Sequence, residues 1–166
     1  MSKIKVLIDS SIYIAWLNKK SEYSNIEKIR TFAENGKIEV VSSIEIRLEI
    51  LNGSNGSADW KKIEKAFQPI THVLTPNCII GDTNGSYKAT LDKSKREWKN
   101  LSNLTKNPKD TKHFITGKDL GLVEYFLALD DRFFNAMKRQ GANYLKNIQL
   151  VKPLELIHAL KKPSCL

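Results

Sequence analysis

Short apolar runs alternate with helix-like segments along the chain. Val6, Leu7 and Ile8 form the first run, and Asp9 ends it. A continuous apolar run of this kind is typical of a strand that is buried on both faces. Further strands are predicted at 38–41, 73–74, 125–129 and 148–151. The spacing of apolar residues predicts helices at 12–17, 26–33, 44–51, 60–67, 87–104, 110–120, 133–137 and 154–160.

Strands that alternate with helices indicate a mostly parallel sheet with helices on both faces. The predicted fold class is therefore α/β, as a three-layer α/β/α sandwich. The 166 residues suit a single domain. We place that domain at 1–160, with an extended helical and loop segment at 53–108 and a loose tail at 161–166. Loops are predicted at 52–57, 76–86 and 106–109.

Four acidic residues fall where strands end or where the following helices run. Asp9 and Asp130 each follow an apolar run, Glu49 lies in the helix after the second strand, and Asp110 opens a later helix. Right-handed crossovers bring the C-terminal ends of parallel strands to one edge, which is where open α/β sheets bind ligands. The alternative is that Asp9 or Ser10, and likewise Asp110, only caps a helix.

Carboxylates gathered at one edge repel one another and raise each other's pKa. A hard divalent cation such as Mg²⁺ or Mn²⁺ prefers oxygen ligands and removes that repulsion. In phosphodiester hydrolysis the same cation places an attacking water and neutralises charge on the phosphoryl oxygens. The acidic cluster therefore predicts a divalent metal site.

Five motifs, in order along the chain, resemble those of the PIN domain, a small α/β nuclease fold of bacterial toxin ribonucleases and eukaryotic RNA-processing factors. The first is a strand followed by Asp and small polar residues (6–11), and the second is a serine followed six residues later by a glutamate (43–49). The third is an Asp that opens a helix and is followed by a His (110–113). The fourth is a strand followed by Asp and Phe (125–133), and the fifth is a strand followed by Pro and a helix (151–156). The chain departs from the family in its long 53–108 segment and in Ala128, where many members have Thr or Ser.

The resemblance implies a divalent-metal-dependent endoribonuclease, in which water attacks the phosphodiester in line and leaves a 5′-phosphate and a 3′-hydroxyl. The catalytic residues it implies are Asp9, Glu49, Asp110 and Asp130, with Mg²⁺ or Mn²⁺ held by Asp9, Asp110 and Asp130. Glu49 would bind a second metal or act through water. Residues expected to position the acids or the phosphate are Ser10, Ser11, Ser43 and His113, although serines near helix starts are usually caps and a helical His is usually packed.

Two of the assigned acids have neighbours that could replace them. Glu45 shares a helical face with Glu49, and the serine spacing favours Glu49. Asp131 competes with Asp130, and the position of Phe133 favours Asp130. Two further acids, Asp119 and Glu124, are predicted to be surface residues.

The sequence leaves two other functions open. One is a catalytically inactive PIN-like module that binds nucleic acid, against which the intact set of acids argues. The other is a magnesium-dependent phospho-receiver or phosphatase-like domain. That class has adjacent acids on its first strand and a Lys at a later strand end, whereas Asp9 stands alone and the 125–129 strand is followed by Asp130.

The chain carries a net charge of +9 at pH 7, which favours a polyanionic partner. Residues 85–118 hold nine Lys and Arg against three acidic residues, so most of the charge lies there. RNA binding through phosphate contacts is predicted for Lys88, Lys93, Lys95, Arg96, Lys99, Lys106, Lys109 and Lys112. Tyr87 and Trp98 could stack on bases, although Trp98 suits the core equally well, and a solvated helix face is the plain alternative.

The remaining features point to a cytoplasmic protein. The sequence has no apolar run of the roughly 20 residues that a membrane span needs, and its start lacks the pattern of a signal peptide. Cys78 and Cys165 stand far apart, which favours free thiols in a reducing compartment. The partners expected are RNA, a cognate antitoxin protein, since length and simple organisation resemble the toxin group, and a second copy of the chain; no membrane is expected.

Overall fold

The computed structural model describes residues 3–73, 85–106, 108–119, 123–139 and 148–161, and for Val73 and residues 85–91 it describes the backbone alone. Its strands form one sheet in the order β3-β2-β1-β4-β5, and every neighbouring pair is parallel. The strands are β1 Ile4–Ile8, β2 Ile38–Ser43, β3 Ile70–Val73, β4 Tyr125–Leu127 and β5 Gln149–Val151. The predicted α/β class with a parallel sheet is confirmed.

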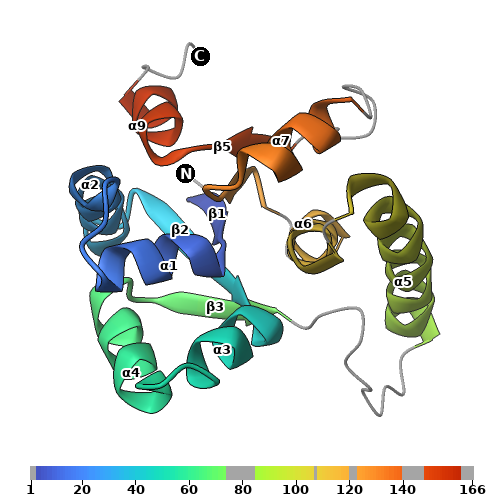
Figure 1. The fold of residues 1–166 in the computed structure, drawn as a ribbon, viewed down its shortest axis with the longest axis horizontal. Helices are drawn as coiled ribbons and strands as arrows, with labels where there is room; N and C mark the ends of the chain where they lie inside the picture. The colour runs from blue at the N-terminus through green and yellow to red at the C-terminus, as the bar shows by residue number, and fades with distance from the viewer. Residues whose placement is uncertain (1–2, 74–84, 107, 120–122, 140–147, 162–166) are drawn as a thin grey trace.

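Helices cover both faces of this sheet, as Figure 1 shows. The first group comprises α1 Ser10–Leu17, α2 Tyr23–Glu34, α3 Ile44–Leu51, α4 Gly56–Ala66 and α9 Pro153–Lys161. The second group comprises α5 Gly85–Thr105, α6 Pro108–Asp119 and α7 Asp131–Lys138. The division follows from right-handed crossovers, because the chain moves from β1 to β3 in one direction and from β3 through β4 to β5 in the other. The result is the predicted three-layer sandwich.

The strand order reverses between β1 and β4, which lie side by side at the centre of the sheet. The helices that follow these two strands, α1 and α7, leave toward opposite faces. Open α/β sheets bind ligands in the crevice that such a reversal opens at the carboxyl ends of the strands. The two strand-end acids, Asp9 and Asp130, follow β1 and β4 at this point.

The core lies on both faces of the central strands. Val6, Leu7 and Ile8 have no exposed surface, which explains the continuous apolar run in β1. On the face of α6 and α7, edge-to-face ring contacts join Phe114, Phe126 and Phe133. On the other face, a second set joins Tyr13, Trp16, Trp60 and Phe67. Each fully buried side chain of this kind contributes about 1.5–3 kcal/mol through removal from water.

Several predicted boundaries are wrong. Strand β2 extends through Ser42 and Ser43, and β4 ends at Leu127, because Ala128 and Leu129 lead into the cap of α7. Helix α4 begins inside the predicted 52–57 loop. Helix α6 begins inside the predicted 106–109 loop, where Pro108 takes the first helical position that suits its fixed φ. The predicted strand at 73–74 is instead β3, which ends at Val73.

Some predictions lie outside the described residues. These are the thiols of Cys78 and Cys165, most of the 76–86 loop, the helix end at 120–121 and the tail after Lys161. Among the described residues, no helix combines the length and apolar character that crossing a membrane requires.

Candidate active site

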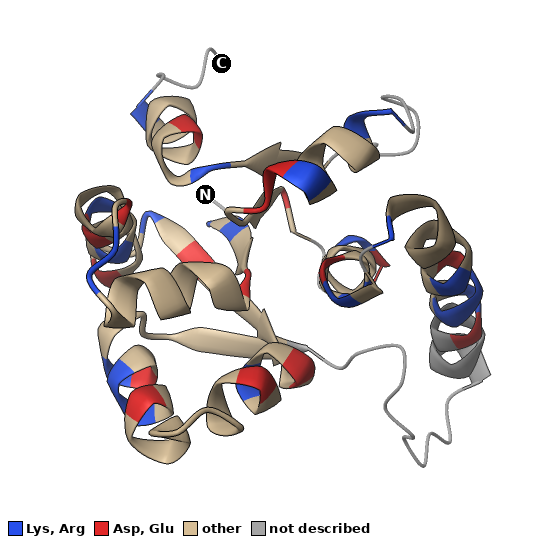
Figure 2. Cartoon of the chain, in the orientation of Figure 1, with Lys and Arg blue, Asp and Glu red and all other residues tan. Residues whose placement is uncertain are grey.

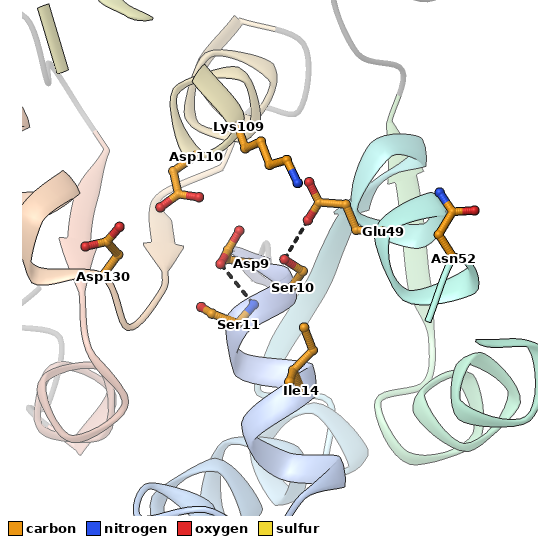
Figure 3. A pocket seen from close by; sticks show the side chains of 9 residues that line it. All are labelled: Asp9, Ser10, Ser11, Ile14, Glu49, Asn52, Lys109, Asp110 and Asp130. Atoms are coloured by element: carbon orange, nitrogen blue, oxygen red, sulfur yellow. Dashed lines mark hydrogen bonds between the residues drawn. The ribbon is translucent and has the colours of Figure 1, made fainter. Parts of the chain in front are cut away.

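A pocket of about 500 Å³ opens at the carboxyl edge of the sheet, where β1 and β4 end (Figure 3). All four predicted catalytic acids line it, although they come from segments more than a hundred residues apart. The complete set of described lining residues is Asp9, Ser10, Ser11, Ile14, Glu49, Asn52, Lys109, Asp110 and Asp130. In Figure 3, Glu49 lies on one side of the pocket and Asp130 on the other, and α6 places Asp110 and Lys109 between them, with the Lys109 ammonium directed toward Glu49.

Asp9 is held by its own helix start. It is the N-cap of α1, where Oδ2 accepts a hydrogen bond from the Ser11 backbone at 3.0 Å. The residue is only 3% exposed, and its second oxygen, Oδ1, has no hydrogen-bond partner among the described residues. A buried carboxylate oxygen without a partner is energetically costly. Asp9 therefore caps the helix with one oxygen and leaves the other available to a ligand. The N-cap of α1 is Asp9 itself, and neither Ser10 nor Ser11.

Glu49 is fixed by two hydrogen bonds from other elements. The Ser10 hydroxyl donates to Oε2 at 2.7 Å, and Nε2 of His113 lies 3.3 Å from Oε1. Partial burial opposes ionisation of Glu49, but these two bonds and the nearby Lys109 charge outweigh it and hold the pKa of the carboxyl below its ordinary value. Glu49 is therefore an ionised acid held in a set position at neutral pH.

His113 connects Glu49 to the end of β2. Its side chain is 1% exposed, and Nδ1 lies 3.4 Å from the Ser43 hydroxyl. The same hydroxyl caps α3 by accepting from the Ile46 backbone at 3.1 Å. The contacts run from Ser43 through His113 and Glu49 to Ser10, so α3, α6 and α1 are aligned around the pocket. His113 is thus a buried, hydrogen-bonded histidine whose side chain contacts Glu49 and Ser43.

Asp110 and Asp130 complete the acidic lining. Asp130 is the N-cap of α7, and its Oδ1 accepts from the Arg132 and Phe133 backbones at 2.8 and 3.3 Å. Asp110 is the third residue of α6 and so is not the N-cap that one alternative required. The rival Asp131 is exposed and forms an ion pair with Lys152, away from the pocket lining.

Glu45 is engaged elsewhere and does not line the pocket. Its Oε1 lies 2.9 Å from Nζ of Lys112, and that ammonium also lies 4.7 Å from the centre of the Trp98 ring. Trp98 in turn donates its indole N–H to the Pro108 carbonyl at 2.7 Å. Because only 15% of the Lys112 side chain is exposed, Lys112 is part of the packing between α3, α5 and α6 and does not belong to a free basic surface.

The other predicted RNA-binding residues are on or near α5. Figure 2 shows Lys and Arg on α5 and α6, with acidic residues interspersed. Those with exposed side chains are Lys93, Lys95, Arg96, Lys99, Lys106 and Lys109. For Lys88 the structure describes only its place in the α5 backbone. We call the six exposed residues the α5 basic surface. Lys109 lies where this surface meets the pocket.

Asp119 is not the surface residue that the sequence predicted. It accepts a hydrogen bond from buried Ser94 at 3.1 Å and forms an ion pair with Lys118 at 3.5 Å, while Lys118 also pairs with Glu97. Burial and the neighbouring Glu97 carboxyl raise the pKa of Asp119. This α5–α6 charge cluster joins the two helices. Glu124, by contrast, is exposed as predicted.

Three lining residues were not predicted as part of the pocket. Ile14 is 42% exposed and lies one turn after Ser10 in α1. Asn52 follows Glu49 by three residues at the end of α3. Lys109 precedes Asp110. Helical spacing from the predicted acids could have found Ile14 and Asn52, because residues three or four apart share a face.

The donor set of the pocket fits a hard divalent cation. Its carboxylate oxygens are the ligands that Mg²⁺ and Mn²⁺ prefer, and Asp9 contributes a buried oxygen that lacks a partner among the described residues. Within the described part of the chain, no three His, Cys, Asp or Glu side chains stand close enough together to hold a metal ion. Mg²⁺ typically takes one or two carboxylates together with waters and substrate phosphates, so Asp9 with one facing carboxylate meets its requirement.

The sequence matches no protein-family model and no curated protein. The resemblance to the PIN domain therefore rests on the motifs of the sequence alone.

Proposed function

We propose that this chain is a divalent-metal-dependent ribonuclease of the PIN type. The observation that carries the proposal is the half-paired, buried Asp9 carboxylate at the strand-order reversal, in one pocket with Glu49, Asp110 and Asp130. Asp9, with Asp110 or Asp130 facing it, would hold Mg²⁺ or Mn²⁺. When bound, such a cation supplies a nucleophile from water and neutralises charge on the phosphoryl oxygens.

The residues of the chain supply position and charge. Ser10 and His113 hold Glu49 ionised at one side of the pocket, where it can orient a water or accept its proton. The N-cap bonds fix Asp9 and Asp130 before substrate arrives, which lowers the reorganisation needed during reaction. The α5 basic surface would add affinity for RNA that does not depend on sequence. An antitoxin partner and a homodimer remain predictions.

The test is RNA cleavage by the purified protein with Mn²⁺ or Mg²⁺, in EDTA, and after Asp9→Asn. Asn is isosteric and still caps a helix well, so the thermal midpoint should be unchanged or higher. We expect cleavage to stop in EDTA and to fall roughly 10³-fold or more in Asp9→Asn, with weaker Mn²⁺ binding by calorimetry.

Asp131→Asn is the matched control, because Asp131 is an exposed neighbour of Asp130 outside the pocket. It should cleave RNA like the wild type. Full activity in Asp9→Asn would remove Asp9 from the site. RNA binding by the wild type without any cleavage would favour the inactive binding module instead.

A further inference from the structure

Lys109 is the one basic residue among the described residues that line the acidic pocket. It lies in the first turn of α6, between Pro108 at the helix start and Asp110 in the pocket. Figure 3 shows its side chain reaching across the pocket mouth to the Glu49 carboxylate, and its charge contributes to the lowered pKa of Glu49. Lys109 therefore brings a positive charge to a site whose other ionisable groups are all acids.

The position of Lys109 is unfavourable for the helix itself. The N-terminus of a helix carries partial positive charge, and an acidic residue there is stabilising whereas a lysine is not. The neighbouring lysines of α6, Lys112 and Lys118, are mostly buried and form ion pairs with Glu45 and Glu97. Lys109 is exposed and forms no ion pair with any described residue. Apart from the attraction between its charge and Glu49 in the pocket, its packing and its helix position give no structural reason for a lysine at this place.

A phosphodiester that enters this pocket meets four carboxylates, and like charges repel. A compact ammonium with three donors is suited to a non-bridging phosphate oxygen, and such charge-assisted bonds are among the stronger ones. We propose that Lys109 contacts the scissile phosphate of RNA and holds it against the carboxylates, an inference that rests on the proposed ribonuclease function. The exposed lysines of α5 lie outside the pocket and would contact only the flanking backbone.

The first test compares Lys109→Ala and Lys109→Arg with Lys61→Ala, a control at an exposed lysine on α4. Single-turnover cleavage with Mn²⁺ gives the chemical rate, and titration of labelled RNA in EDTA gives Kd. We expect Lys109→Ala to lower the rate about 100-fold, with only a small change in Kd. Removing one hydrogen-bond donor to a developing oxyanion has an effect of this size in other enzymes. Lys109→Arg should recover part of the rate, and Lys61→Ala should match the wild type.

The second test asks whether Lys109 acts only through Glu49, whose ionised form it favours. Lys109→Ala is repeated in a Glu49→Gln background. If Lys109 contacts phosphate, the second substitution still lowers the residual rate; if it acts only through Glu49, the second substitution has no effect and the proposal is wrong.

The same experiments separate the two proposals. A wild-type protein that does not cleave RNA overturns the ribonuclease function and this inference with it. A wild type that cleaves RNA, beside a Lys109→Ala variant with an unchanged rate, overturns the role of Lys109 alone.

Discussion

The acidic pocket and the pair of helices α5 and α6 both concentrate charge, but the fold uses that charge in opposite ways. In the pocket, four acidic side chains are brought together, and two of them, Asp9 and Asp130, are held by hydrogen bonds from helix starts. On α6, the side chains of Lys112 and Lys118 turn inward and are neutralised by Glu45 and Glu97. Four acids that line one pocket with a single lysine, among the residues that the structure describes, indicate a binding site, whereas a count of charges along a helix does not.

The two regions also differ in how they are anchored. The elements that carry Asp110 and Asp130 meet in a buried ring cluster of Phe114, Phe126 and Phe133. In the part of α5 whose side chains are described, residues 92–105, many side chains face solvent, and Leu104 near its end is 63% exposed. Substitutions should therefore destabilise the pocket scaffold much more than the outer face of α5.

The largest effect on stability is expected from Phe133→Ala. Phe133 is fully buried, and removing such a ring leaves a cavity that typically costs about 3–5 kcal/mol in the free energy of unfolding. Leu104→Ala on α5 should change it by less than about 0.5 kcal/mol. Urea unfolding followed by circular dichroism measures both. Phe133→Leu serves if the Ala variant does not fold, and equal losses at positions 133 and 104 would contradict the proposed difference in anchoring.

The central part of the site could be predicted from the sequence because it depends on local signals. An apolar run followed by an acid places Asp9 at a strand end, and parallel strands end at one edge of the sheet. The choice of Glu49 over Glu45 could only be favoured, since residues four apart share a helical face. What distinguishes them is contact with residues far along the chain, His113 for Glu49 and Lys112 for Glu45.

The α5 region was harder to predict for the same physical reason. Whether a lysine binds RNA or forms an internal ion pair depends on which helix packs against it, and sequence periodicity does not record that. Lys118 and Asp119 are engaged by Glu97 and Ser94, which lie more than twenty residues away. Asp119 thus belongs to a charge cluster although its sequence context resembles that of a surface residue.

A smaller effect, on binding and not on stability, is expected from charge reversal on α5. The triple variant Lys95→Glu, Arg96→Glu and Lys99→Glu should weaken RNA binding and flatten its dependence on salt. Each lost phosphate contact lowers the slope of log K against log salt by about 0.7 for a single strand. The slope should therefore fall by up to about 2 in fluorescence-anisotropy titrations.

The matched control reverses Lys61, Lys62 and Lys65 on α4, which are exposed on the other face of the sheet. The two variants have the same net charge, so a general field effect would change them equally. An equal loss of affinity in both would remove the α5 basic surface from the RNA interface.

The smallest effect is expected from the α5–α6 charge cluster, as a pH dependence of stability. Burial and Glu97 raise the pKa of Asp119 in the folded protein above its ordinary value of 3.8, so the folded state holds the proton more tightly than the unfolded state does. The stabilisation from this group is complete below that ordinary value and is lost as pH rises through the folded pKa.

Asp119→Asn cannot titrate but keeps an acceptor for Ser94. In thermal unfolding from pH 4 to 7, the midpoint of the variant should therefore rise relative to that of the wild type as pH rises. A difference in midpoint that stays constant over this range would mean that Asp119 does not titrate differently in the folded and unfolded states. The cluster would then join α5 to α6 through fixed charges alone, as the ion pair of Lys112 and Glu45 joins α6 to α3.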